Sequence, residues 1–114
     1  MSKQKLNKKL KDIVNGLKPY NPEKIIIFGS YATGAIRENS DLDLLVIKNT
    51  KKRRVDRIEE CLNLLYKKKY LGIGEYDLSI EPIVFTPQEI KKGMQMDDPF
   101  ISKIIKEGKL IYER

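Results

Sequence analysis

Apolar residues follow two spacings along this chain, and each spacing predicts a different kind of element. At the start they recur every three or four positions (Leu6, Leu10, Ile13, Val14 and Leu17), which predicts an amphipathic helix over residues 3–16. Gly16 and Pro19 end that helix. Asn21-Pro22 predicts a turn, and the β-branched run Lys24 to Phe28 that follows predicts a buried strand.

A second apolar run, Leu42 to Ile47, is apolar on both faces beyond Asp43. It therefore predicts a strand that lies in the centre of its sheet. Between the two runs, Gly29-Ser30 ends the first strand sharply. Residues 30–35 can form one helical turn, whose length Gly34 limits.

Helical spacing returns over residues 52–68, which predicts the longest helix, with an apolar face made by Val55, Ile58, Leu62 and Leu65. Cys61 lies beside that face, and we interpret it as a small core residue. Residues Tyr76 to Phe85 predict a third strand, in which Pro82 indicates a sheet edge or a bulge.

The C-terminal part predicts two more helices and a short strand. Thr86 to Glu89 has the pattern of a helix start, with Thr86 as N-cap and Glu89 closing a capping box. A further helix is expected over residues 98–107, ended by Gly108, with Phe100, Ile101, Ile104 and Ile105 facing inward. Leu110 to Tyr112 predicts the last strand.

Together these elements predict one α/β domain of the α+β kind, a small mixed β-sheet flanked by helices, over residues 1–114. A chain of 114 residues can bury a hydrophobic core without disulfides. No apolar run is long enough to cross a bilayer, and the basic N-terminus has no apolar signal segment. The single cysteine, Cys61, fits a reducing compartment. We therefore expect a cytoplasmic protein that does not enter a membrane.

Composition narrows the chemistry. The chain has no histidine, which excludes Ser-His-Asp triads, Cys-His dyads and histidine-based zinc sites. Carboxylates acting on a hard cation such as Mg²⁺ become the leading candidates.

The net charge of +7 favours an anionic partner without selecting one. Lysines 67–69 are best interpreted as a solvated helix end, because cations complement the dipole at a helix C-terminus. The cluster from Lys51 to Arg54 would lie at a helix N-terminus, where the dipole opposes it. That cluster is the better candidate for a binding role, with nucleic acid a possible but not favoured partner, although solvated surface is the simpler explanation for both clusters.

Asp41 and Asp43 carry the strongest chemical signal. Two positions apart on a strand, their side chains point to the same face. Two carboxylates that close raise each other's pKa unless a cation lies between them. A bound divalent metal ion is the simplest way to compensate the repulsion between these two carboxylates. The alternative, two acids at an exposed strand start, does not explain the apolar residues around them.

The turn Gly29-Ser30 complements this pair. Glycine lets a phosphate approach the backbone closely, and Ser30 offers a hydroxyl and backbone N–H groups to anionic oxygens. If the strands Lys24 to Phe28 and Leu42 to Ile47 are antiparallel neighbours, the turn lies beside Asp41 and Asp43.

Two-metal phosphoryl or nucleotidyl transfer usually needs a third carboxylate on an adjacent strand. In the third predicted strand, Asp77, Ser79 and Glu81 alternate onto one face. That row is either a solvent-facing surface or the source of the missing ligand.

The string Gly29-Ser30, ten residues and then Asp41-x-Asp43 resembles the minimal nucleotidyltransferases of the DNA polymerase beta superfamily. The resemblance implies that Asp41 and Asp43 bind Mg²⁺ and that Gly29 and Ser30 hold the triphosphate of ATP or another nucleotide. The third acid of that family lies five residues before the threonine that opens the next helix, which points to Glu81, where Asp is more usual. Asp77 is the substitute.

The resemblance also implies a biological role. Minimal members of this family pair with a small helical HEPN-domain protein, as antitoxin to toxin, and transfer AMP to it. We therefore expect a protein adenylyltransferase that works in a complex. Two alternatives stay open: a non-catalytic module that neutralises its partner by contact, and a transferase that modifies an antibiotic or a nucleic acid.

Overall fold

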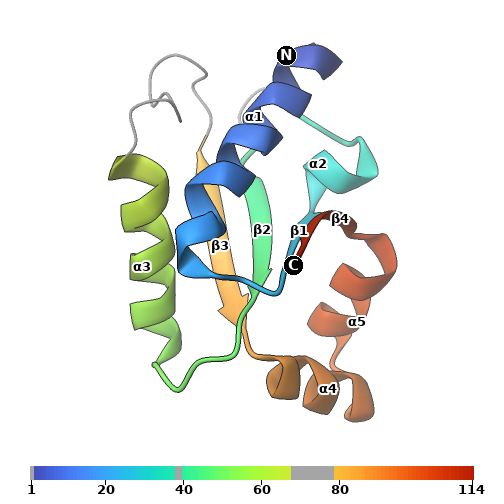
Figure 1. Cartoon of the computed structure of the whole chain (residues 1–114). Coiled ribbons are helices and arrows are strands. Elements are labelled where there is room, and N and C mark those ends of the chain that lie inside the picture. Colours follow the sequence, from blue (N-terminus) through green and yellow to red (C-terminus); the bar gives the residue numbers. More distant parts are fainter. Residues whose placement is uncertain (1, 38–39, 68–78) are drawn as a thin grey trace.

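The computed structural model describes residues 2–37, 40–67 and 79–114. They form a four-stranded mixed sheet with helices on both faces (Figure 1). In chain order the elements are α1 (Lys3–Leu17), a 3₁₀ turn (Lys18–Tyr20), β1 (Lys24–Phe28), α2 (Ser30–Thr33), β2 (Leu42–Ile47), α3 (Arg54–Lys67), β3 (Ile80–Phe85), α4 (Pro87–Gln95), α5 (Pro99–Glu107) and β4 (Lys109–Glu113).

The strands lie in the order β3-β2-β1-β4. β1 runs antiparallel to β2 and to β4, whereas β2 and β3 are parallel and are joined through α3. A parallel pair needs such a crossover connection, because the chain must return to the same end of the sheet. The predicted mixed sheet and the central position of Leu42 to Ile47 are therefore confirmed.

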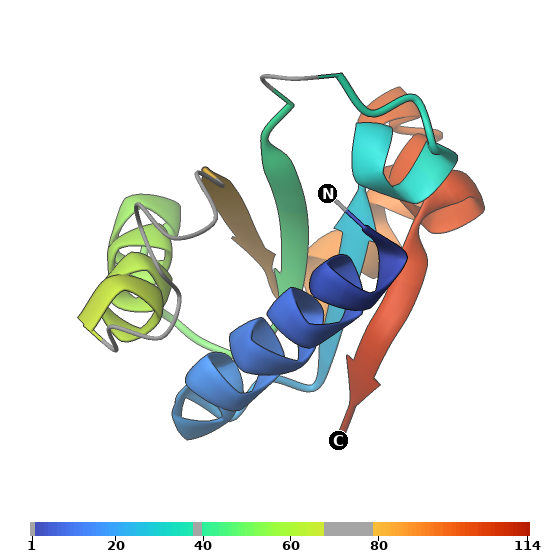
Figure 2. The ribbon, with the colours of Figure 1, turned by 90° about the horizontal axis from the view of Figure 1, so that it is seen from above.

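The sheet separates two layers of core (Figure 2). On one face, α1 and α3 pack their apolar side chains against alternate residues of β1, β2 and β3, which builds the larger cluster, including Ile13, Leu17, Leu44, Val46, Cys61 and Leu65. On the other face, α4 and α5 cover a smaller cluster that includes Leu45, Phe85, Ile101 and Ile104. Because side chains alternate along a strand, Leu44 and Leu45 belong to opposite layers.

The sequence predicted most element bounds closely. β1 and β2 have the predicted bounds, and Pro82 lies on β3, an edge strand of the sheet, as expected. β3 is described from Ile80; residues 76–78 of the predicted strand lie outside the described residues. The N-cap of α4 is Thr86, and the capping box with Glu89 is present.

Two predicted helix faces are correct only in part: on α3, Leu65 is fully buried as predicted, but Val55 is not. Val55 is 60% exposed, because the buried face of α3 is centred on Arg57, Cys61 and Leu65 instead. The Arg57 side chain turns inward to donate hydrogen bonds to the carbonyls of Lys52 and Val84. A hydropathy pattern assigns arginine to the solvent side of a helix. The face predicted for α3 is therefore displaced by about one residue from the face that is buried.

The second error concerns α5. Ile101 and Ile104 are buried as predicted, but Phe100 and Ile105 are 49% and 43% exposed. The helix contacts the sheet along one narrow stripe, so residues next to that stripe remain open to solvent. Phe100 lies edge-on to the ring of Phe28 at the margin of the layer, with ring centroids 5.8 Å apart.

Cys61 is fully buried, as predicted for a core residue, and burial raises the pKa of its thiol to about 12, with a smaller contribution from Glu60. A thiol with so high a pKa is unreactive at neutral pH. Among residues 2–37, 40–67 and 79–114, no helix combines the length and apolar character needed to cross a bilayer.

Candidate active site

The antiparallel pairing of β1 and β2 brings the end of one strand to the start of the other. Phe28, the last residue of β1, pairs with Asp43, so the turn at Gly29 lies directly beside the Asp43 side chain. Gly29 has φ +72° and ψ −152°, a backbone conformation found almost exclusively for glycine. A Cβ atom at this position would lie 2.3 Å from Oδ2 of Asp43. The turn therefore needs glycine for its conformation and for its closeness to the carboxylate.

Backbone hydrogen bonds fix the turn that follows. The N–H groups of Ala32 and Thr33 both donate to the carbonyl of Gly29, at 3.0 and 3.1 Å. The N–H of Gly34 donates to the carbonyl of Ser30 and ends α2 after one turn, with Gly34 at φ +85°. As a result, Ser30 begins a rigid single turn of helix next to the acidic residues.

The parallel pairing of β2 and β3 positions Glu81, the acid expected as third carboxylate. Asp43 pairs with Glu81 across the two strands, so both side chains point to the same face of the sheet. Strand pairing thus places Glu81 opposite Asp43, and Asp43 lies against the turn at Gly29. Asp77, the substitute for Glu81, lies outside the described residues.

The electrostatics of these carboxylates reflect their closeness. The negative charge of Asp41 raises the pKa of the Glu81 carboxyl. Desolvation, hydrogen bonding to Asp41 and the negative charge of Asp43 raise this pKa further. Burial raises the pKa of Asp43, and the charge of Asp41 adds to the effect. Burial and Asp41 likewise raise the pKa of the Tyr31 hydroxyl on α2. The site therefore concentrates negative charge that a bound cation would neutralise.

The donor set suits a hard divalent cation. Among the described residues, no three acidic or sulfur side chains already converge as a metal-binding group. Mg²⁺, however, is commonly held by one or two carboxylates together with substrate phosphates, rather than by an all-protein cage. The neighbouring carboxylates of Asp41 and Asp43, with Asp43 lying against the turn at Gly29, fit that mode of binding.

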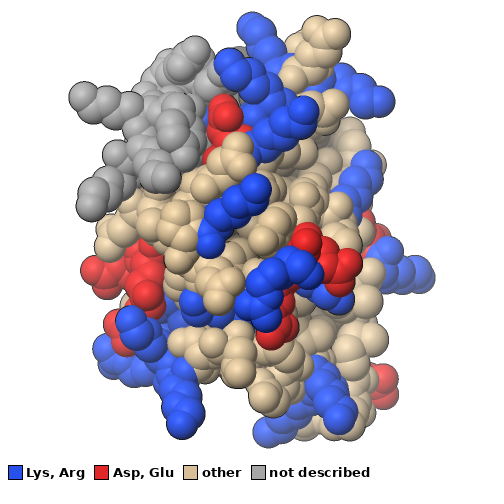
Figure 3. Space-filling view, in the orientation of Figure 1, with Lys and Arg blue, Asp and Glu red and all other residues tan. Residues whose placement is uncertain are grey.

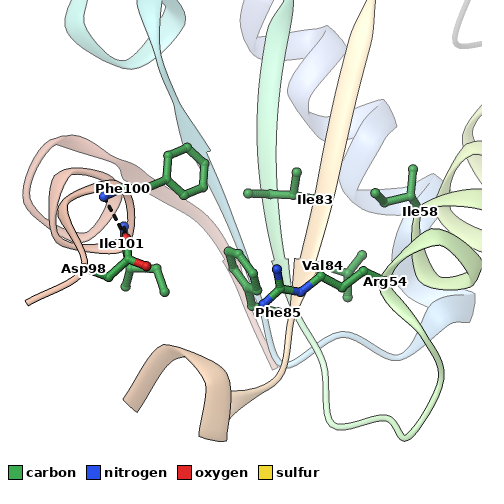
Figure 4. A pocket seen from close by; sticks show the side chains of 8 residues that line it. All are labelled: Arg54, Ile58, Ile83, Val84, Phe85, Asp98, Phe100 and Ile101. Carbon is green, nitrogen blue, oxygen red and sulfur yellow. Dashed lines mark hydrogen bonds between the residues drawn. The ribbon is translucent and has the colours of Figure 1, made fainter. Parts of the chain in front are cut away.

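A pocket of about 350 Å³ lies farther along β3, on the face of the sheet to which Glu81 points. Figure 4 shows its walls: Ile83 and Phe85 from β3, Phe100 and Asp98 from α5, and Arg54 and Ile58 from α3. The sequence analysis did not find this pocket, because it placed Phe100 in the core. The signal in the sequence that could have indicated the pocket is the position of Phe100, directly after Pro99 in the first turn of a helix, where side chains are often only partly buried.

The basic cluster from Lys51 to Arg54 is largely neutralised within the molecule. Three of its side chains form ion pairs: Lys52 with Glu60 at 3.2 Å, Arg53 with Asp56 at 3.1 Å and Arg54 with Glu89 at 3.4 Å. On the α1 and α3 side, Figure 3 shows basic side chains gathered at the N-terminal end of α1 and mixed with acidic ones elsewhere. This distribution favours solvated surface over a nucleic-acid interface at α3. Residues 68 and 69 of the second cluster lie outside the described residues.

Comparison with known proteins finds a matching family model and similar sequences. Residues 8–114 match the family model described as "Polymerase beta, Nucleotidyltransferase". Two relatives come from Methanocaldococcus jannaschii. "Putative protein adenylyltransferase MJ1305" is 40% identical over 91 residues, which cover 79% of this chain and 58% of that protein. "Putative protein adenylyltransferase MJ0604" is 32% identical over 108 residues, covering 92% of this chain and 96% of that protein.

The chain thus spans little more than half of the first relative and nearly all of the second. Among solved structures, the fold is similar to a crystal structure of a toxin-antitoxin with AMP-PNP, with a TM-score of 0.61 and 19% identity over 92% of this chain and 73% of that one. A structure of the toxin-antitoxin pair MntA-HpeT superimposes with a TM-score of 0.50 and 17% identity, covering all of this chain and 74% of that one. At these identities the likeness establishes the fold.

Proposed function

Because the chain belongs to the polymerase beta nucleotidyltransferase family, we propose that it transfers AMP from ATP to a partner protein. The acceptor oxygen of the partner attacks the α-phosphorus of ATP, the bond to the β-phosphate breaks, and pyrophosphate leaves. The names of both archaeal relatives support the protein acceptor. The observation that carries the proposal is the Asp43 carboxylate packed against the Gly29 turn, with Glu81 across the strand pair.

Each residue has a role that follows from its place. Gly29, whose missing Cβ leaves space for Oδ2 of Asp43, and Ser30 would hold the triphosphate, with Ser30 donating hydrogen bonds to its oxygens. Asp41 and Asp43 would hold Mg²⁺, and Glu81 contributes the third carboxylate. When bound, the cation neutralises charge on the phosphates and on the leaving pyrophosphate.

The partner we propose is a toxin, a small helical HEPN-domain protein. Support comes from the fold, which is shared with chains of two toxin–antitoxin structures. In this role the chain is the antitoxin, and transfer of AMP to the toxin is what inactivates it.

A contact-only antitoxin is the second candidate. The observation that favours it is the exposed Glu81, a residue with a longer and less constrained side chain than the aspartate usual in this family. In that case the chain keeps nucleotide binding and neutralises its partner without any transfer.

The test uses the chain co-purified with its natural partner, Mg²⁺ and ATP labelled either at the α- or at the γ-phosphate. We expect label on the partner from α-labelled ATP alone, with equimolar release of pyrophosphate, and no transfer after chelation of the metal. Label from γ-labelled ATP would show phosphoryl transfer and contradict the proposal. Intact binding and neutralisation with no label from either form would favour the contact-only antitoxin.

A further inference from the structure

The pocket is connected to the acidic residues through Phe28 and along β3. Phe28 pairs with Asp43 on the sheet and lies edge-on to the ring of Phe100, and Phe100 lines the pocket. On β3, Ile83 and Phe85 follow Glu81 at two-residue steps, so all three side chains point to the same face. With a strand rise of about 3.3 Å per residue, the pocket extends from about 7 to about 13 Å away from Glu81.

The walls of this pocket are flat, apolar and aromatic. Phe100 is half exposed, and the guanidinium of Arg54 lies 4.6 Å above the ring of Phe85, which extends that planar surface. Ile83 and Ile58 close the floor and the far side, as Figure 4 shows. Aromatic and guanidinium planes are the groups on which nucleobases stack in proteins.

Resting on the function proposed above, we infer that this pocket binds the base of the nucleoside triphosphate. The ribose then spans the step between the α-phosphate at Asp43 and the ring of Phe100. Its volume of about 350 Å³ lies within the roughly 300–1,000 Å³ of small-ligand pockets. The Asp98 carboxylate on the pocket wall, whose Oδ1 accepts the N–H groups of Phe100 and Ile101, adds an acceptor suited to an exocyclic amine.

The experiment separates the base from the triphosphate. Binding of α,β-methylene ATP, which cannot release pyrophosphate, and of inorganic tripolyphosphate is measured calorimetrically with Mg²⁺ for the wild type and for Phe100→Ala. We expect Phe100→Ala to weaken the nucleotide by roughly fivefold or more, as expected for loss of a stacked ring. Tripolyphosphate has no base and should bind within roughly twofold of the wild type.

Ile105→Ala is the matched control. Ile105 lies on the same helix with a similar exposure, but it does not line the pocket, so both ligands should bind as in the wild type. Thermal unfolding checks that each variant is folded. If Phe100→Ala is not folded, Phe100→Leu takes its place, because leucine keeps the apolar contact with Phe28 and removes only the stacking plane.

Three results would overturn the inference. Unchanged nucleotide affinity in the folded Phe100 variant excludes base stacking there, and if AMP transfer is lost at the same time, the pocket receives the acceptor. Equal weakening of nucleotide and tripolyphosphate shows that Phe100 only supports the phosphate turn. A wild-type chain that binds neither ligand contradicts the proposed function itself, a result that no pocket variant can imitate.

Discussion

Gly29 is the residue at which conformation and chemistry meet. Its φ of +72° excludes most other residues, and its missing Cβ leaves the space that Oδ2 of Asp43 occupies. Gly34 also has a positive φ, at +85°, but a Cβ there would meet nothing within 4 Å. A side chain at either glycine would strain the backbone, but only a side chain at Gly29 would also crowd the Asp43 carboxylate. Comparing substitutions at the two positions therefore separates the two effects.

Gly29→Ala should damage the site more than Gly34→Ala does. Both variants should lose stability, by about 1–3 kcal/mol, because alanine is strained at positive φ. In Gly29→Ala the new methyl group also displaces the Asp43 carboxylate, so AMP transfer should fall by at least roughly tenfold. Chemical denaturation and the transfer assay measure the two effects. Equal activity in both variants would show that the position of the Asp43 carboxylate does not matter.

Asp41→Asn and Asp43→Asn remove charge while keeping shape. Because both acids lie where negative charge accumulates and burial raises the pKa of Asp43, loss of a charge should not destabilise the fold. We expect folded variants with AMP transfer reduced by roughly a hundredfold or more, since each loses a ligand to the metal. The outcome that contradicts the mechanism is a double variant with full transfer, measured under the same conditions as the wild type.

At the level of the elements, Arg57 and Glu89 join three of them. Nη1 of Arg57, on α3, lies 2.7 Å from Oε1 of Glu89 and donates to the carbonyl of Val84, at 3.2 Å. The same Oε1 accepts the N–H of Thr86, and the Thr86 hydroxyl accepts the N–H of Glu89, which closes the cap of α4. One carboxylate thus connects α3, the end of β3 and the start of α4.

This connection should make stability sensitive to acid. Burial alone would raise the pKa of Glu89, but the Thr86 N–H, Arg57 and Arg54 outweigh it and hold the pKa below its usual value of 4.5. A carboxyl whose pKa is lowered by folding contributes stability above the unfolded pKa, and this contribution is lost as the pH falls through the folded value. Wild type should therefore exceed Glu89→Gln in stability at pH 7, by about 1–2 kcal/mol.

Denaturant titrations at several pH values measure this difference. The advantage of the wild type over Glu89→Gln should shrink as the pH falls below 4.5. The control is Glu59→Gln, at an exposed position on α3, which should change stability little at either pH. An advantage that stays constant from pH 7 to pH 3 would show that the charge of Glu89 does not carry the effect.

For the whole molecule, the two faces of the sheet are unequal. The layer under α1 and α3 is the larger, while the layer under α4 and α5 leaves part of the sheet open as the pocket along β3. This asymmetry decides which apolar residues stabilise the fold and which are available to a ligand.

Leu44 and Val55 test this asymmetry. Leu44 is fully buried in the larger layer, whereas Val55 on α3 is 60% exposed. Leu44→Ala should cost about 2–5 kcal/mol, because it removes buried methylene groups and leaves a cavity. Val55→Ala should change stability by less than about 0.5 kcal/mol. Urea denaturation measures both, and a large loss in Val55→Ala would restore the helix face predicted from hydropathy.

The sequence by itself determined the elements and the candidate chemistry. Local signals were sufficient for this: β-branched runs for β1 and β2, the capping box at Thr86, and the spacing of Gly29-Ser30 from Asp41 and Asp43. Each depends on residues close together in the chain, whose conformational preferences and side-chain directions follow from local geometry. Antiparallel pairing of β1 and β2 then placed the turn beside Asp43, as predicted.

Only the tertiary structure decided which helix faces are buried and which apolar side chains line an open pocket. Arg57 is buried because partners from β3 and α4 satisfy its guanidinium, and a hydropathy pattern contains no such information. Phe100 is exposed because α5 covers only part of the sheet. Burial depends on which surfaces meet, and those contacts join residues that are distant in sequence.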